Sequence, residues 1–211
     1  FLNLWSFDIP QDTYRNFGEN FPLKSLRISL GTHHKLNFYM ECFPNIENMS
    51  IRFGDANNEV TFNDSYDDDG LKHENMKELS LTFMTNTNAN SELFGKMLTS
   101  FPNLEKLRFT SKLAFSNEFF TNLLLNLGRL RNIALNEWYI EEGERFSPEA
   151  IESLKKLSKI LSYGKFSLRN REGQNACRRG SKNIIFEPLV DGLKDYYKIK
   201  EGGYCINVVI N

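Results

Sequence analysis

Histidine side chains are the first groups in this sequence that could bind a metal ion or move a proton. His33 and His34 are adjacent, so their side chains point in different directions. No Cys, His or Asp accompanies them at the spacing that metal ligands need. We interpret this pair as part of a polar turn.

An acidic stretch and three cysteines are the other candidates for chemistry. The stretch could hold calcium, but it lacks the alternating spacing and the closing Glu of an EF-hand loop. Its residues are Asp64, Asp67, Asp68 and Asp69, followed by Gly70. The cysteines are scattered and have no evident His partner; they are Cys42, Cys177 and Cys205. We therefore predict no catalytic residue, no metal site, no cofactor and no enzyme activity.

Composition bounds the class of protein. The 211 residues are 40% hydrophobic and 25% charged, so a buried core is expected. The 26 basic and 27 acidic residues give a net charge of −1, which excludes a bulk polycation. No apolar run reaches the roughly 20 residues that a membrane span needs. Few, unpaired cysteines favour reduced thiols and a cytoplasmic or nuclear location. Because the first residue is Phe1, we expect this sequence to be part of a longer chain.

A repeated pattern must position any functional side chains. The pattern is apolar-x-x-apolar-x-apolar, and it recurs at intervals of about 23–33 residues. The six full copies are Leu23/Leu26/Ile28, Ile46/Met49/Ile51, Met76/Leu79/Leu81, Leu104/Leu107/Phe109, Leu130/Ile133/Leu135 and Tyr163/Phe166/Leu168; Leu2/Leu4 is a shortened seventh. The last two apolar positions lie two apart, as in a strand with one buried face. Such strands, stacked in parallel, would share one core.

The segments between these strands predict helices that return the chain. Parallel strands need such crossovers. The helical stretches begin near Ser91, Ser116 and Ser147, and a shorter one spans 37–42. In the third, Ser147 is the expected N-cap and Pro148 the first helical residue. Its predicted buried face consists of Ala150, Ile151, Leu154, Leu157, Ile160 and Leu161. The acidic stretch 54–70 is expected to be a surface connection.

These repeats resemble leucine-rich repeats of the irregular intracellular kind. The phrases that carry the likeness are FPLKSLRIS, FPNIENMSI and FPNLEKLRF, which begin at Phe21, Phe43 and Phe101. F-box leucine-rich-repeat proteins are the most similar group. The resemblance implies an α/β leucine-rich-repeat solenoid of about seven repeats over residues 1–170, with a curved parallel sheet on the concave side and helices and loops on the convex side. The usual Asn or Cys after the last strand leucine is absent; these positions hold Gly31, Gly54, Met84, Lys112 and Trp138.

The concave face is the predicted binding surface. Side chains that alternate with the buried pair include six basic residues and one acidic residue, Glu78. The basic residues are Arg27, Arg52, Lys106, Arg108, Lys165 and Arg169. Arginine suits carboxylates and phosphates because its planar fork donates two parallel hydrogen bonds. Trp5 lies at one end of this face, and Trp138 and Tyr139 are expected just after the sixth strand, at a loop edge. These two aromatics are either binding anchors or plugs of the turn.

The last 41 residues break the period. Residues 184–186 and 206–210 predict strands, and 188–197 predicts a short helix. An open solenoid end exposes core and strand edge, so we interpret 171–211 as a C-terminal capping unit.

The sequence therefore predicts a protein-recognition module. The resemblance makes it the substrate-binding part of an F-box-type ubiquitin ligase adaptor, with a Skp1-like adaptor as a further partner if an F-box precedes Phe1. The groove would bind an acidic or phosphorylated protein segment. Nucleic acid is disfavoured because no aromatic side chains separate the arginines. The alternative is a structural subunit of a larger protein or ribonucleoprotein assembly.

Overall fold

The structure is a computed structural model that describes residues 2–5, 23–30, 36–53, 72–83, 91–111, 117, 128–140, 146–170, 187–195, 197–202 and 205–210. Several predictions lie outside these residues. They concern the histidine turn, the acidic stretch 54–70, Cys177, the strand at 184–186, and the helix after Ser116, of which only Asn117 is described and is helical.

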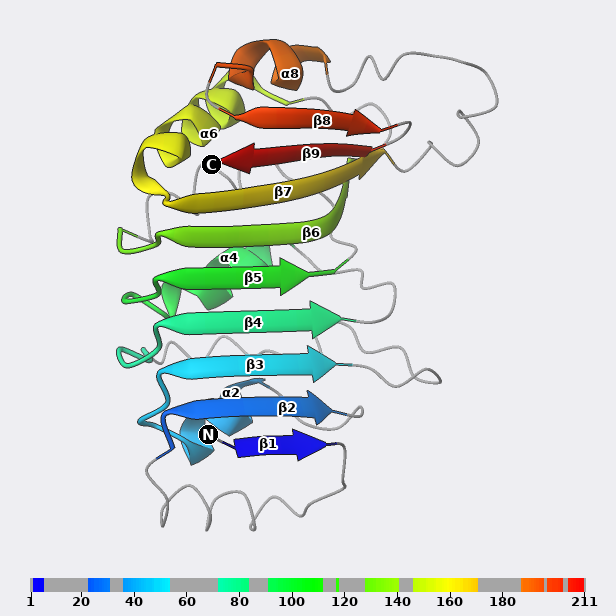
Figure 1. The fold of residues 1–211 in the computed structure, drawn as a ribbon. Helices are drawn as coiled ribbons and strands as arrows, with labels where there is room; N and C mark the ends of the chain where they lie inside the picture. The colour runs from blue at the N-terminus through cyan, green and yellow to red at the C-terminus, as the bar shows by residue number, and fades with distance from the viewer. Residues whose placement is uncertain are drawn as a thin grey trace.

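Seven parallel strands form most of a single sheet, and they lie side by side in chain order (Figure 1). They are β1 (Leu2–Trp5), β2 (Ser25–Leu30), β3 (Asn48–Phe53), β4 (Glu78–Phe83), β5 (Lys106–Thr110), β6 (Asn132–Ile140) and β7 (Tyr163–Asn170). Helices alternate with them along the chain. The predicted α/β class, with parallel strands joined by returning segments, is confirmed.

The register confirms the predicted row of buried side chains. Met49 pairs with Leu26 on one side and with Leu79 on the other, and the row continues through Leu107 to Ile133. All five are at most 2% exposed. Buried residues alternate with less buried ones along the strands, and in β4 the alternating residues from Glu78 to Phe83 are half-buried and buried. One strand could not cover this apolar face alone, so each repeat depends on the next.

The helices cover the buried face of the sheet. They are α2 (Leu36–Cys42), α4 (Ser91–Thr99), α6 (Pro148–Ile160) and α8 (Glu187–Leu193). α2 and α4 lie behind the sheet in Figure 1. Phe94 of α4 packs on Phe109 of β5 with their ring centroids 4.1 Å apart. No described helix covers the opposite face, which we call the open face.

The start of α6 follows the predicted capping chemistry. The Ser147 hydroxyl accepts a hydrogen bond from the backbone N–H of Ala150 at 3.1 Å, and Pro148 opens the helix. Ala150, Leu154 and Leu157 are buried as expected. The prediction for Ile160 is wrong, because its side chain is 45% exposed. The helix ends at this residue, and the following Leu161 turns inward instead.

The last repeat, Tyr163/Phe166/Leu168 in β7, is offset from the predicted alignment by two residues. Ile133 pairs with Gly164, and Phe166 pairs with Leu135. Phe166 is still buried at 1% exposure, but it continues the second apolar row. A glycine therefore stands where earlier repeats carry a large side chain. A shift of two residues leaves every side chain of β7 on the same face of the sheet, so the alternating pattern around residue 166 fits the predicted and the observed alignment equally well.

The chain ends in a different arrangement. β9 (Cys205–Ile210) pairs antiparallel with β7, and β8 (Lys198–Gly202) pairs antiparallel with β9 at the edge of the sheet. The predicted helix and final strand are present as α8 and β9, whereas β8 was not predicted. The Tyr197 hydroxyl donates to the backbone carbonyl of Leu154 and so joins this unit to α6. Burial raises the pKa of this hydroxyl.

Candidate functional site

Three rows of side chains cross the open face, because the register aligns equivalent positions of successive strands. The first row is Ser25, Asn48, Glu78, Lys106, Asn132 and Tyr163. The middle row is Arg27, Ser50, Ser80, Arg108, Ala134 and Lys165. The third row is Ser29, Arg52, Thr82, Thr110 and Asn136.

Neighbours in the first row bind one another. The Asn48 amide donates to the Ser25 hydroxyl at 3.2 Å. Lys106 and Glu78 form an ion pair. The only acidic side chain predicted on this face therefore neutralises one of the predicted cations. In the third row, the Asn136 amide donates to Thr110 Oγ1 at 3.2 Å. Cross-strand pairs of this kind stabilise sheets.

The middle row differs because its charged members have no such binding neighbours among the described side chains. Arg27 and Arg108 are exposed and Lys165 is half-buried. Within the described residues, none of the three forms an ion pair. Two serines lie between the arginines, and Ala134 lies between Arg108 and Lys165. Since these spacers are small, the face is hollowed along the row.

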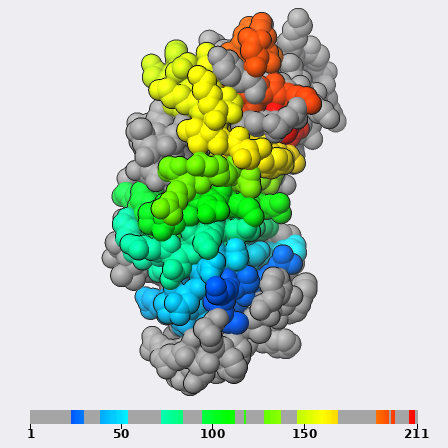
Figure 2. Space-filling model, turned by 60° about the vertical axis from the view of Figure 1, so that its left-hand side comes forward, coloured from blue at the N-terminus to red at the C-terminus, as the bar shows by residue number. Residues whose placement is uncertain are grey.

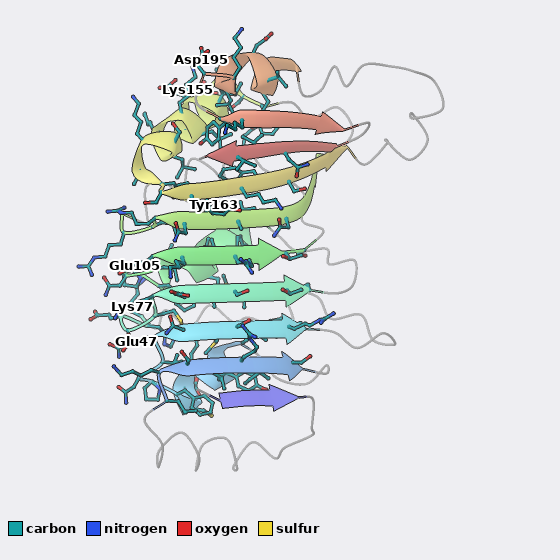
Figure 3. The ribbon with its side chains drawn as sticks, in the orientation of Figure 1. Glu47, Lys77, Glu105, Lys155, Tyr163 and Asp195 are labelled. Atoms are coloured by element: carbon teal, nitrogen blue, oxygen red, sulfur yellow. The ribbon has the colours of Figure 1, made fainter. Side chains whose placement is uncertain are left out.

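The hollow is a groove with a volume of about 630 Å³. Its lining includes both arginines of the middle row and the serines between them. Tyr163 lines one end, where its side chain is 43% exposed. Figure 3 shows Tyr163 at the start of β7. The groove thus combines two separated guanidinium groups, a floor of hydroxyls, one aromatic side chain and the ion pair of Lys106 with Glu78 from the first row.

A second charged row lies where the strands begin, and we call it the leading edge. Its members, Lys24, Glu47, Lys77, Glu105 and Arg131, immediately precede β2 to β6. Each backbone carbonyl accepts two N–H groups from the following repeat; Glu47, for example, accepts from Lys77 at 2.8 Å and Glu78 at 3.0 Å. This repeated turn stacks the five side chains in one line. Figure 2 brings the edge forward, and Figure 3 shows Glu47, Lys77 and Glu105 along it.

Charge alternates in sign along the leading edge, so that neighbours attract. Glu47 accepts from Lys77 at 2.7 Å and from Lys24 at 2.9 Å. The hydrogen bond from Lys77, followed by that from Lys24, lowers the pKa of Glu47 from 4.5 to about 2. The bond to Glu47 raises the pKa of Lys77 in turn. Lys24, Glu47 and Lys77 therefore satisfy one another, which gives this part of the edge a structural role.

An asparagine ladder lies before the strands. The usual leucine-rich-repeat pattern would place such a residue after them. The Asn75 amide donates to the carbonyl of Pro44 at 3.2 Å, and the Asn103 amide donates to that of Glu74 at 2.8 Å. Each bond joins a turn to the preceding repeat. The signal in the sequence is an Asn directly before the first apolar position of a repeat, Asn75 before Met76 and Asn103 before Leu104. We assigned these asparagines no hydrogen-bonding role from the sequence.

The structure distributes the predicted site residues unevenly. Arg27 and Arg108 share the middle row with Lys165. The repeat alignment of the sequence placed Lys165 in the first row with Lys106, so Lys165 lies one row further along the strands than predicted. Arg52 lies in the third row and Lys106 in the first. Tyr163, which sequence reasoning used only as a repeat position, is a lining residue of the groove.

The aromatic candidates need a correction. Trp138 and Tyr139 lie inside β6, paired with Leu168 and Arg169, and the predicted loop-edge location is wrong. A register shift between Leu135 and Trp138 allows the two strands to continue past the point where earlier strands stop. The side chains of Trp5, Trp138, Tyr139 and Arg169 lie outside the described part of the structure.

In the described ranges, no three His, Cys, Asp or Glu side chains gather as a metal site would require. Cys42 is buried in the core and does not line the groove. No helix in the described part of the chain is both long and apolar enough to span a bilayer.

Comparison of the chain with protein-family models, curated proteins and solved structures found no match.

Proposed function

We propose that this chain is a protein-recognition module of leucine-rich-repeat type, and that its groove binds an acidic or phosphorylated segment of a partner protein. The observation that supports this function most is the middle row. Its two arginines stand over a hollow floor, and no described acid neutralises them. The solenoid arrangement is supported by seven strands in chain order and by one type of turn that is repeated along the leading edge.

The chemistry of the row favours an anionic protein partner. Guanidinium groups bind carboxylates or phosphates in a bidentate manner. Hydroxyls between them can donate to or accept from a peptide backbone. Base stacking, on which single-stranded nucleic acid binding depends, would need aromatic side chains between the arginines, and Ser50 and Ser80 occupy those positions.

Charge reversal in the middle row tests the function. Proteins retained by the wild-type chain would be compared, by quantitative mass spectrometry, with those retained by Arg27→Glu/Arg108→Glu. The matched control is Arg52→Glu, which reverses a charge on the same face in the third row. We expect the double variant to retain fewer partners with acidic segments. Any retention of such partners that remains should depend less on salt concentration. An unchanged set of partners would remove the groove from consideration.

The finer proposal is a substrate-binding part of an F-box-type ubiquitin ligase adaptor. It is supported by the irregular repeats and by the Phe-Pro phrases alone. The full-length protein would then co-purify with a Skp1-like adaptor at equal stoichiometry. A full-length chain that lacks any F-box segment, or that fails to bind such an adaptor, would eliminate this proposal and leave the recognition module intact.

A structural subunit of a larger protein or ribonucleoprotein assembly is the second candidate. The observation in its favour is Ile160, a large apolar side chain that is 45% exposed at the end of α6. If that surface is an assembly contact, Ile160→Lys would release the chain from its complex, whereas the charge reversal in the groove would not.

A further inference from the structure

The spacing of the middle-row arginines carries an inference about the form of the bound segment, and this inference rests on the proposed function. Arg27 belongs to β2 and Arg108 to β5, and the register places them at the same level of the sheet. Neighbouring strands lie about 4.8 Å apart, so three intervals separate the two Cα atoms by roughly 14 Å.

An extended segment that crosses the strands matches this distance. A β-like chain rises about 3.3 Å per residue, so four residues span roughly 13 Å. Side chains four apart in such a chain also point to the same side, because the side-chain period is two. We infer that the groove binds an extended segment of a partner protein with two acidic side chains, Asp or Glu, at positions i and i+4.

The floor of the groove favours an extended segment over a helix. Ser50 and Ser80 offer half-exposed hydroxyls between the arginines. An extended segment has free backbone N–H and C=O groups that those hydroxyls can bind. The middle of a helix has none, because its backbone groups bind one another. The side chain at i+2 would face these serines, so a small residue fits best there.

The charge at the two arginine positions favours carboxylates over phosphates. The middle row places one arginine at each position; Lys106, beside Arg108 in the first row, is engaged by Glu78. The next cation of the middle row, Lys165, lies two strands beyond Arg108, and Arg52 lies in the third row, diagonal to Arg27. A carboxylate carries a single charge that one guanidinium can match. A phosphorylated side chain carries about −1.5 to −2 and calls for further cations.

Synthetic peptides test the spacing directly. Three fluorescent 11-residue peptides of Gly, Ser and Thr would each carry two Glu, at i,i+2, i,i+4 or i,i+6. All three present both acids on one side when extended and have equal charge, so they differ in span alone. We expect the i,i+4 peptide to bind about five- to tenfold more tightly than the other two, by fluorescence anisotropy.

Substitutions assign the effect to the two arginines. Arg27→Gln and Arg108→Gln should each remove the advantage of the i,i+4 peptide, and Arg52→Gln should retain it. Circular dichroism melts would show that all three variants fold. Tighter binding of the i,i+4 peptide, together with the loss of this advantage in the Arg27→Gln and Arg108→Gln variants, supports the inference.

Other outcomes overturn it in distinguishable ways. Equal affinity for all three spans, weakened by the Arg27 and Arg108 variants, rejects the i,i+4 spacing and leaves the proposed function standing. Tighter binding of a peptide with two phosphoserines at the same spacing rejects the carboxylate assignment. Tighter binding of a thymidine oligonucleotide rejects a protein partner, and binding of no probe rejects both the inference and the acidic groove.

Discussion

The leading edge and the middle row cross the same strands, yet they use charge in opposite ways. Along the leading edge, the sign alternates from one repeat to the next, and Glu47 binds both of its neighbours. In the middle row all charges are positive, and uncharged side chains separate them. One repeat unit therefore builds a row that holds the stack together and another row whose charges form no ion pair among the described residues.

Physical spacing explains why the cations of the middle row tolerate one another. Like charges directly opposite on adjacent strands would destabilise the sheet. Two intervening serines place Arg27 and Arg108 roughly 14 Å apart, which exceeds the Debye length of about 8 Å at physiological ionic strength. The repulsion between them is therefore small, and the sheet holds both guanidinium groups at little cost.

The largest effect should come from the core that both rows share. Leu107 lies between Lys106 and Arg108 in β5 and is 2% exposed. Leu107→Ala should lower the free energy of unfolding by about 2–5 kcal/mol, because it removes buried methyl groups and leaves a cavity. Urea denaturation measures this loss. Leu107→Met, which nearly conserves volume, should cost less than about 1.5 kcal/mol. A loss of similar size in both variants would contradict the packing argument.

Substitutions of two glycines should change the stability of the chain without changing its binding. A Cβ atom on Gly192 of α8 would lie 2.6 Å from Cγ2 of Ile151 in α6, whereas one on Gly95 of α4 would meet nothing within 4 Å. Gly192→Ala should therefore destabilise the chain by about 1–3 kcal/mol through overpacking.

Gly95→Ala is the matched control for Gly192→Ala. It should stabilise the chain by about 0.5–1 kcal/mol, because alanine is the better helix former. Both glycines lie away from the groove, so neither variant should change peptide affinity at temperatures where the chain is folded. A parallel loss of affinity in Gly192→Ala would show that the groove depends on the C-terminal unit.

The fold was predictable from sequence where one residue type had to recur. Leu26, Met49, Leu79, Leu107 and Ile133 recur at one offset because each strand must hide its apolar side against the next. The prediction was wrong where the period changes. β6 continues through a register shift to Ile140, and its partner β7 begins two residues earlier than the repeat pattern indicates. A local irregularity of backbone pairing leaves no periodic signal.

The candidate site was predictable only in outline. Alternation placed Arg27, Arg52, Lys106 and Arg108 on one face, and the register confirms that placement. Which cations remain available depends on pairs between distant residues, such as Lys106 with Glu78, and no local pattern encodes them. The part played by Tyr163 depends on where β7 begins, which was the feature that the sequence left open.

The leading edge makes a prediction about pH. The pKa of Glu47 is lowered from 4.5 to about 2 in the folded chain by Lys77 and Lys24. Its contribution to stability is therefore fully present above pH 4.5 and is lost as the pH falls toward 2.

Glu47→Gln removes this contribution. The wild type should be more stable than the variant at pH 7, and the difference should disappear between pH 4.5 and 2. Urea unfolding across this range measures the difference. High salt should reduce it, because these side chains are partly exposed. A difference that persists at pH 2 would mean that Glu47 acts through packing and not through its charge.

The smallest expected effect on stability belongs to the middle row, and it defines the contrast with the leading edge. Arg27→Ala and Arg108→Ala remove exposed side chains that form no ion pair among the described residues. Each should change the free energy of unfolding by no more than about 0.5 kcal/mol. The same variants should weaken acidic-peptide binding, so stability and affinity separate in this row. If either arginine instead proves necessary for folding, its charge is satisfied within the chain, and the middle row is a second structural row.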